Sequence, residues 1–213
     1  MLVIIKTITI VIIGNKYRKN GEKMRIITGK YRGKKLACLN DETIRPTLDR
    51  VKETLFDILQ FRIANCRAID LFAGSGSLGI ECISRGASEV VFADINPKCI
   101  ELIKSNLLSL KLDIMPQVCY RGWFDALNAN RKTKFDIIFI DPPYKSGNYY
   151  DVLKRINDLN VLADEGVIAV EHDAYDPICD GVGNLQKYKE TKIGSVLLSF
   201  YSLVKPELVA INE

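Results

Sequence analysis

From residue 67 onward, short apolar runs alternate regularly with segments of helical periodicity. The runs are dense in Ile, Val and Phe without clean polar alternation, which is typical of strands covered on both faces. The predicted strands span residues 67–71, 89–94, 115–120, 135–140 and 166–171, and the predicted helices between them span about 77–85, 97–110, 122–129 and 149–159. Repeated strand–helix units with short loops predict an α/β fold with a mostly parallel, doubly wound sheet.

Two further segments flank this alternating region. Gly194-Ser195 separates two strand-like runs within residues 187–204, which predicts a closing antiparallel hairpin. Residues 25–39 predict a small β-hairpin with a glycine-containing basic turn. A helix is predicted after Pro46, and Thr47 can cap its start. We therefore expect an extension over 1–23, a basic β-hairpin over 24–44 and a main domain over 45–213.

Positive charge is concentrated near the amino terminus. The segment Lys16–Lys35 carries nine basic residues and one acidic residue, Glu22, whereas the whole chain has a net charge of only +4. A concentrated basic arm on a slightly acidic body indicates a polyanionic partner such as a nucleic acid. The alternative is a solvated charged segment with no partner.

The cysteine pattern and the first residues of the chain indicate the cellular compartment. Six cysteines are scattered without C-x-x-C spacing, and there is a single histidine, His172. This pattern favours core thiols in a reducing compartment and argues against a zinc site, so we expect no metal and a cytoplasmic protein. The apolar stretch Met1–Ile13 is shorter than the roughly 20 residues that span a bilayer. We expect no membrane association, and we expect residues 1–23 to be an extension or to precede a true start at Met24.

A glycine-rich loop follows the first predicted strand. Gly74-Ser75-Gly76-Ser77-Leu78-Gly79 fits G-x-G-x-x-G between a strand ending near Asp70 and a helix. Glycines there let backbone amides approach a ligand, and Asp94, at the end of the next strand, can accept hydrogen bonds from ribose hydroxyls. NAD-binding proteins and methyltransferases share this motif. The alternative is a tight turn without a ligand, with Asp94 capping the helix near Pro97.

Asp141-Pro142-Pro143-Tyr144 follows the fourth predicted strand. The Asp141 carboxylate and the Pro142 carbonyl can each accept one N–H of an exocyclic amine, and Tyr144 can stack on the base that carries it. Proline suits a rigid corner because it fixes φ and has no N–H of its own. The alternative is an ordinary turn with a loop tyrosine.

The topology brings these two motifs together. In a sheet of order 3-2-1-4-5, strands one and four are neighbours at the switch point, where ligands bind beyond the strand carboxyl ends. We therefore predict that the glycine loop and the acid-proline corner share one cleft. A nucleotide-like cofactor beside a planar amine indicates methyl transfer from S-adenosylmethionine (SAM), for which positioning supplies most of the rate.

Four blocks of the chain carry a family resemblance. They begin at Arg25 (RIITGKYRGKKL), Arg45 (RPTLDRVKETLF), Asp70 (DLFAGSGSLGIE) and Asp141 (DPPY). In this order they resemble the RsmD family of bacterial class I SAM-dependent methyltransferases, which modify guanine N2 in 16S ribosomal RNA. The resemblance runs from about Met24 to about Val204, and it implies a Rossmann-like fold with a seven-stranded sheet.

The resemblance also implies roles for individual residues. Asp141, Pro142, Pro143 and Tyr144 would form the catalytic motif. The cofactor would be bound by Thr47, Arg50, Asp70, Phe72, Ala73, Gly74, Gly76, Gly79, Asp94 and Ile95, with Asp125 as the expected adenine contact and Trp123 as an alternative. Ribosomal RNA, within the small subunit or its precursor, would be contacted by Arg25, Lys30, Arg32, Lys34, Lys35 and Arg45.

Other functions stay open from the sequence. A DNA or RNA adenine-N6 methyltransferase would have a similar catalytic corner. A NAD-dependent oxidoreductase would use the glycine loop but leaves Asp141–Tyr144 unexplained. A non-catalytic RNA-binding assembly factor would have no need of an intact acidic corner. We expect a monomer, because nothing in the sequence requires a dimer.

Overall fold

The computed structural model describes residues 24–39, 46–143, 148–176 and 178–204, with side chains from residue 49 onward in the first helix. The predictions for residues 1–23, Arg45 and Tyr144 lie outside this part of the chain. The helices are α1 (Pro46–Leu59), the short 3-10 helix η1 (Gln60–Arg62), α2 (Ser77–Ser84), α3 (Pro97–Leu110), α4 (Trp123–Ala129) and α5 (Tyr149–Leu159). The strands are β1 (Arg67–Asp70), β2 (Glu89–Asp94), β3 (Gln117–Tyr120), β4 (Phe135–Ile140), β5 (Leu162–Asp173), β6 (Gly181–Val182), β7 (Leu185–Ile193) and β8 (Val196–Leu203).

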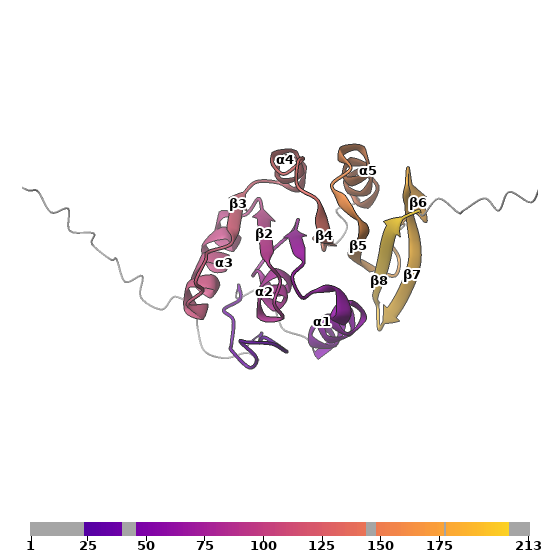
Figure 1. Ribbon diagram of the computed structural model, residues 1–213. Helices are drawn as coiled ribbons and strands as arrows, with labels where there is room; N and C mark the ends of the chain where they lie inside the picture. Colours follow the sequence, from indigo (N-terminus) through magenta and orange to yellow (C-terminus); the bar gives the residue numbers. More distant parts are fainter. Residues whose placement is uncertain (1–23, 40–45, 144–147, 177, 205–213) are drawn as a thin grey trace, which may run out of the picture.

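All described strands form one sheet in the order β3-β2-β1-β4-β5-β8-β7-β6. The pairs among β1 to β5 are parallel, whereas β8, β7 and β6 are added in antiparallel pairs. The predicted doubly wound α/β sheet, the order 3-2-1-4-5 and the closing hairpin are confirmed. Helices α4 and α5 lie on one side of the sheet, and α1, α2 and α3 on the other (Figure 1).

The structure corrects the predicted number of strands. The described part of the chain has eight strands in the sheet rather than seven. The additional strand is β6, whose two residues pair with Leu185 and Gln186 of β7. Two residues are too few to show a strand periodicity in a sequence. Helix α1 also differs from expectation, because it begins at Pro46 and so contains Thr47 in its first turn rather than as a cap.

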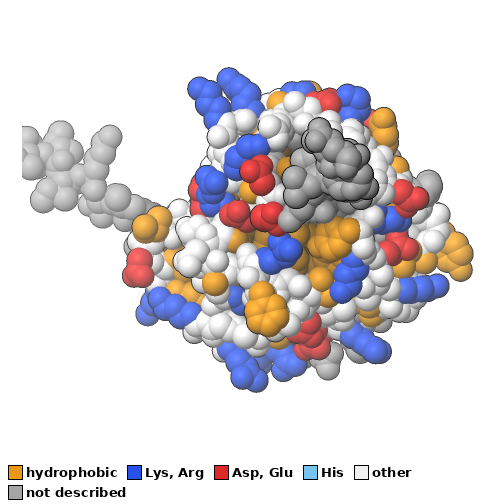
Figure 2. Space-filling view, turned by 45° about the vertical axis from the view of Figure 1, so that its right-hand side comes forward, with side chains coloured by type: hydrophobic (Ala, Val, Ile, Leu, Met, Phe, Trp, Pro, Cys, Tyr) orange, Lys and Arg blue, Asp and Glu red, His pale blue; other side chains and the backbone are white. Residues whose placement is uncertain are grey.

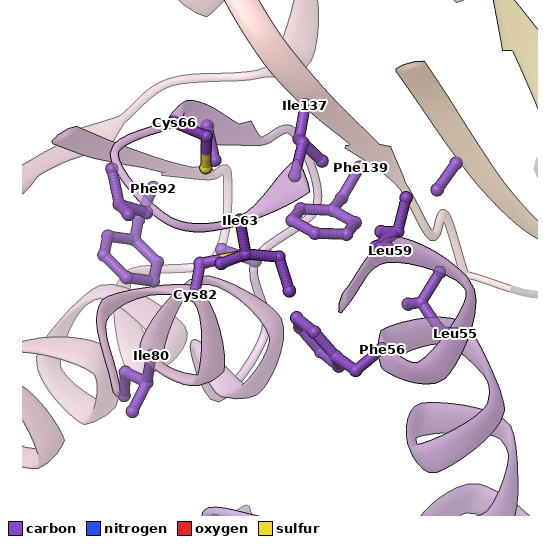
Figure 3. Close-up of a cluster of buried hydrophobic side chains, with 14 of the residues drawn as sticks. Leu55, Phe56, Leu59, Ile63, Cys66, Ile80, Cys82, Phe92, Ile137 and Phe139 are labelled. Carbon is purple, nitrogen blue, oxygen red and sulfur yellow. The ribbon is translucent and has the colours of Figure 1, made fainter. Parts of the chain in front are cut away.

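Two apolar clusters hold the layers together, one on each side of the sheet. The cluster on the α1–α3 side is shown in Figure 3, where α1 directs Leu55, Phe56 and Leu59 towards β4. The rings of Phe56 and Phe139 are 6.1 Å apart between centroids. The other cluster joins α4 and α5 to alternate residues of the same strands. Because residues of the central strands alternate between the two clusters, β1, β2, β4 and β5 are buried on both faces over most of their length, as their apolar sequences predict.

The predicted hairpin over residues 25–39 has one antiparallel bridge, Arg25 with Lys35, and backbone hydrogen bonds join its two arms: Leu36 N–H to Met24 O, Ile26 N–H to Lys34 O and Gly33 N–H to Ile26 O. Its backbone also bonds to helical side chains. The N–H groups of Ile27 and Thr28 donate to the Glu81 carboxylate at 2.8 and 2.9 Å. The Ala37 N–H donates to Asn106 Oδ1 at 2.8 Å. These contacts attach the hairpin to α2 and α3.

Glu81 is the buried centre of this attachment. Its carboxylate pairs with Lys52 Nζ of α1 at 3.3 Å and with Arg85 Nε at 2.9 Å. Burial lowers the pKa of Lys52, and the Glu81 charge opposes that shift. A buried carboxylate with two cationic partners and two backbone donors is fully satisfied, so residues 24–39 are firmly joined to the main fold. Within the described residues, none of the helices is both long and apolar enough to cross a membrane.

Candidate active site

A cavity of about 1030 Å³ lies at the carboxyl ends of β1, β2, β4 and β5. Gly74 lines it from the loop after β1, and Asp141 lines it from the corner after β4. The side chains of Asp49 and Lys52 reach it from α1. The structure therefore brings the two predicted motifs together, because β1 and β4 are neighbours in the sheet. On the face shown in Figure 2, a recessed apolar area is bordered by acidic side chains, with basic side chains around it.

Asp94 fixes the backbone conformation of the loop after β1 through hydrogen bonds. Asp94 Oδ2 accepts the Gly74 N–H at 2.9 Å, and Asp94 Oδ1 accepts the Asn96 N–H at 2.7 Å. Asn96 in turn caps α3 by accepting the Lys98 N–H. Gly74 has a φ of +51°, a left-handed conformation that disfavours other residues. Asp94 therefore fixes the backbone of the loop and also lines the cavity.

The three glycines of the motif have different surroundings. Gly74 lines the cavity, whereas neither Gly76 nor Gly79 is among the described lining residues. A Cβ on Gly79 would lie 2.3 Å from Phe92 Cε1, so this glycine allows α2 to pack against β2. Gly76 precedes α2 with a φ of +81°. Gly76 and Gly79 therefore contribute through close packing around the loop. Close packing of helix against strand is the usual role of the third glycine in such motifs.

Asp70 is a buried carboxyl group in the wall of the cavity. Burial raises its pKa to about 7 and the nearby Asp94 charge adds to the shift, while backbone N–H groups of Phe72 and Gly79 oppose it. Asp70 Oδ1 has no hydrogen-bond partner among the described residues. A buried acceptor without a partner carries a cost that a donor on a bound ligand would relieve. Phe72, Ala73 and Ile95, also predicted here, line the same cavity.

The corner after β4 is rigid and lies partly open to solvent. Asp141 and Pro143 are exposed, Pro142 is buried, and all three line the cavity. Tyr149 also lines the cavity, and its hydroxyl donates to Asp176 Oδ2 at 3.3 Å. Two consecutive prolines fix the φ angles of this segment and contribute no N–H donors. The corner therefore presents acceptors to the cavity on a backbone with little freedom.

Some predicted residues lie away from the cavity. Asp125 is exposed in the first turn of α4 and is not among the described lining residues, whereas Gly122, Trp123 and Phe124 are. Arg50 is also exposed and outside the lining. Thr47 belongs to the first turn of α1, where side chains are not described. Trp123, the alternative adenine contact, lies at the cavity, and the assignment of the adenine contact stays a prediction.

Other cavity residues were not predicted. Glu171 and His172, near the end of β5, and Tyr149, at the start of α5, line the cavity. His172 is buried, with Nε2 2.9 Å from Ser199 Oγ. Burial is the main cause that lowers its pKa. The position of these residues in the sequence could have indicated them, because a polar residue at the end of a buried parallel strand lies at the ligand-binding edge of the sheet.

The basic turn lies away from the cavity. The Lys30 N–H donates to Ser84 O at the end of α2, and Lys34 Nζ donates to Ser109 O near the end of α3. The cavity is instead lined by Ser77 and by Asn96, at the starts of these helices. At about 1.5 Å per residue, the turn is separated from the cavity by roughly the length of α2, on the order of 12 Å. Arg32 and Lys35 belong to the same segment, whereas Arg25 directly follows Met24, which lines the cavity, and its carbonyl accepts from Lys52 Nζ at 3.3 Å.

Comparison with known proteins identifies the family. A family described as "Conserved hypothetical protein 95" matches residues 24–202. The chain belongs to this family. It is 37% identical to "Ribosomal RNA small subunit methyltransferase D" of Haemophilus influenzae, over 73% of this chain and 82% of that protein. It is 32% identical to the protein of the same name from Escherichia coli strain K12, over 84% and 89%.

Solved structures agree with this assignment. The structure of yhhF from Escherichia coli has a TM-score of 0.76 at 32% identity, covering 85% of this chain and 98% of that one. The resemblance to the RsmD family is confirmed by these matches, and so is the class I methyltransferase fold. The family match begins at residue 24, where the sequence resemblance also begins.

Proposed function

We propose that this protein transfers a methyl group from SAM to the exocyclic N2 amine of a guanine in 16S ribosomal RNA. One observation carries the proposal: the glycine loop after β1 and the Asp141–Pro143 corner after β4 line a single cavity. A donor site and an acceptor site must meet for a direct transfer between two bound molecules. The names of the Haemophilus influenzae and Escherichia coli relatives support ribosomal RNA as the substrate.

The cavity has features that fit SAM. Gly74 lines it in a conformation that exposes backbone, Asp94 offers carboxylate oxygens, and Asp70 has a buried oxygen without a partner among the described residues. Apolar contacts come from Phe72, Ile95 and Trp123, with Phe72 and Trp123 partly buried against the core. When bound, SAM supplies an electrophilic methyl group on its sulfonium centre.

The corner after β4 would activate the acceptor. The lone pair of an exocyclic amine is delocalised into the base, so the amine is a weak nucleophile. In the proposed mechanism the Asp141 carboxylate and the Pro142 carbonyl each accept one amine N–H, which orients the lone pair away from the ring plane. Pro142 is buried and held rigid, so this geometry is preorganised. Tyr144, outside the described residues, stays a candidate for stacking on the base.

Methyl transfer to a neutral amine leaves an additional proton on nitrogen. In the proposed mechanism Asp141 accepts that proton. Because Asp141 is exposed, the proton can then pass directly to water. The target guanine must leave its stack to enter a cavity of this kind. The basic turn, about the length of α2 away, would hold phosphates of the flanking RNA rather than the target base. We further propose that the protein acts as a monomer on the small subunit or its precursor in the cytoplasm.

Tritiated-methyl transfer tests the proposal. Purified protein is incubated with labelled SAM and, separately, small ribosomal particles, naked 16S RNA and DNA, followed by nucleoside analysis. We expect label in N2-methylguanosine from ribosomal substrates. Label in N6-methyladenosine would favour the adenine alternative. No label despite SAM binding by titration calorimetry would favour an assembly factor, and binding of NAD in place of SAM would favour an oxidoreductase.

A further inference from the structure

Glu171 and Asp141 occupy adjacent positions at the carboxyl edge of the sheet. Ile140 of β4 is paired in register with Val170 of β5, so the next residue on each strand is Asp141 and Glu171. The two strands are parallel neighbours, and adjacent strands lie about 4.8 Å apart. Both residues line the cavity. Two carboxylates from neighbouring strands therefore face the same ligand space.

Alternation along β5 shows which side of the sheet Glu171 faces. Ala169, two residues earlier, packs in the cluster on the α1–α3 side, and Val170 packs in the cluster on the opposite side. Because strand side chains alternate, Glu171 projects to the α1–α3 side. Phe139, two residues before Asp141, packs on that side as well. By the same alternation, the His172 side chain projects to the opposite side of the sheet, where its Nε2 lies 2.9 Å from Ser199 Oγ.

Glu171 differs in its contacts from three other carboxylates of the cavity, Asp70, Asp94 and Asp173. Asp94 accepts two backbone N–H groups, Asp173 Oδ1 accepts the Tyr175 N–H, and Asp70 is approached by backbone donors. The Glu171 carboxylate forms no hydrogen bond or ion pair with another described residue, whereas the Glu171 backbone is paired with the buried Leu198 of β8. Burial raises the pKa of Glu171 to about 7. A largely desolvated carboxylate of this kind is costly unless a ligand supplies its donor.

Guanine presents such a donor beside its reactive amine. Its Watson–Crick edge carries the N1–H next to the N2 amine, so two neighbouring acceptors can read both groups. Adenine has an unprotonated N1 next to its amine, which would place a lone pair against a carboxylate. We propose that Glu171 accepts the N1–H of the target guanine while Asp141 binds the N2 amine, and that this contact selects guanine over adenine. The inference rests on the proposed guanine-N2 function and names the residue that determines its base specificity.

The test replaces guanine with an analogue that lacks O6 and the N1–H, and it changes one heavy atom of the side chain. Semisynthetic 16S RNA carries either guanine or 2-aminopurine at the mapped target position. 2-Aminopurine keeps the amine at C2, but its N1 is an acceptor without hydrogen. For the wild-type protein we expect kcat/KM for 2-aminopurine to be about 100-fold below that for guanine, because a site built around a donor rejects an analogue that lacks it.

In Glu171→Gln, the amide can donate to N1 of 2-aminopurine or accept from guanine. We expect the 100-fold preference to shrink to within about tenfold, mainly through a lower rate with guanine. The fluorescence of 2-aminopurine, which rises when the base is unstacked, gives a binding readout, and we expect tighter binding of this RNA by Glu171→Gln than by the wild type. SAM affinity, measured by calorimetry, should be unchanged within about twofold and reports that the variant is folded.

The outcomes separate this inference from the function on which it rests. If the wild-type protein methylates guanine but uses 2-aminopurine equally well, Glu171 does not read N1–H, whatever the variant does. The same conclusion follows if the preference is unchanged in Glu171→Gln. If the wild-type protein methylates no guanine in any ribosomal substrate, both the proposed function and this inference are rejected.

Discussion

The two sides of the cavity differ in how their polar groups are satisfied. On the cofactor side, Asp94 binds backbone N–H groups of Gly74 and Asn96, and the loop is shaped by the chain itself. On the proposed acceptor side, Asp141 is exposed, and the Glu171 carboxylate has no hydrogen bond to another described residue. The loop on the proposed cofactor side is thus shaped by the chain itself, with the buried Asp70 Oδ1 left for a ligand, whereas we propose that the Glu171 carboxylate receives its donor from the substrate. The predictions below test each part of that contrast.

The largest expected effect concerns the buried Asp70 on the cofactor side. Burial raises its pKa from 3.8 to about 7. Between these values the unfolded chain has released the proton while the folded protein keeps it, so the free energy of unfolding falls as pH rises. The slope is about 1.4 kcal/mol per pH unit, or roughly 4 kcal/mol in total.

Asp70→Asn should remove this component. We expect urea denaturation to show a smaller loss of stability from pH 4 to pH 7 in the variant than in the wild type. Asp125→Asn, at an exposed carboxylate, is the matched control and should follow the wild type. Parallel pH profiles for Asp70→Asn and the wild type would mean that Asp70 titrates normally and is not held in a desolvated wall.

The second effect concerns the loop on the same side. Asp94→Ala removes the acceptor of the Gly74 and Asn96 N–H groups. We expect SAM affinity to fall about 100-fold, which corresponds to about 2.7 kcal/mol. Titration calorimetry measures the change. Asp125→Ala, the residue that sequence reasoning placed at the adenine, should lose less than about twofold; an equal loss in both variants would restore Asp125 to the cofactor site.

The third effect separates packing from ligand contact within the glycine motif. In Gly79→Ala the new methyl group would meet the Phe92 ring at 2.3 Å. We expect the free energy of unfolding to fall by about 1–3 kcal/mol through overpacking. SAM affinity, measured well below the melting temperature, should stay within about threefold. A variant of normal stability with abolished SAM binding would show that Gly79 contacts the cofactor.

The smallest effect tests the distance between the basic turn and the cavity. Lys34 donates to Ser109 O and lies over the Tyr31 ring, at the end of α3 far from the cavity. In Lys34→Gln/Lys35→Gln we expect the slope of log affinity against log salt to fall by about 1–2, with a raised KM and an unchanged kcat at saturating RNA.

Lys132→Gln is the control for this pair, because Lys132 is exposed in the loop before β4, at the opposite end of that strand from Asp141. It should leave the salt slope unchanged. If the double variant behaves like Lys132→Gln, the basic turn has no part in RNA binding.

The sequence predicts the frame of this site well and its details less well. The order of the parallel strands follows from their apolar runs and short loops, and it places the glycine loop beside Asp141. Glu171 was missed because its role depends on register between β4 and β5, which a single sequence does not encode locally. Asp125 is not among the described lining residues, although Gly122, Trp123 and Phe124 directly before it are, and its contact with the adenine stays a prediction.

The amino-terminal segment shows another limit of sequence reasoning. Glycines and flanking apolar residues predict a hairpin over 25–39, and the two arms are bridged there, but the sequence does not predict that the same backbone also bonds to Glu81 and Asn106. Those partners lie more than fifty positions away along the chain. Local propensity cannot reveal such tertiary partners, and here they attach the hairpin to the main fold.

The most direct test of the account is the behaviour of Asp141→Ala, assayed for SAM affinity by calorimetry and for methyl transfer to small ribosomal particles. Because the cofactor side is shaped without Asp141, we expect SAM affinity within about threefold of the wild type and a loss of transfer of at least about 1000-fold. Near-normal turnover, or a loss of SAM binding that matches the loss of transfer, would contradict the division of the cavity into a cofactor side and an acceptor side.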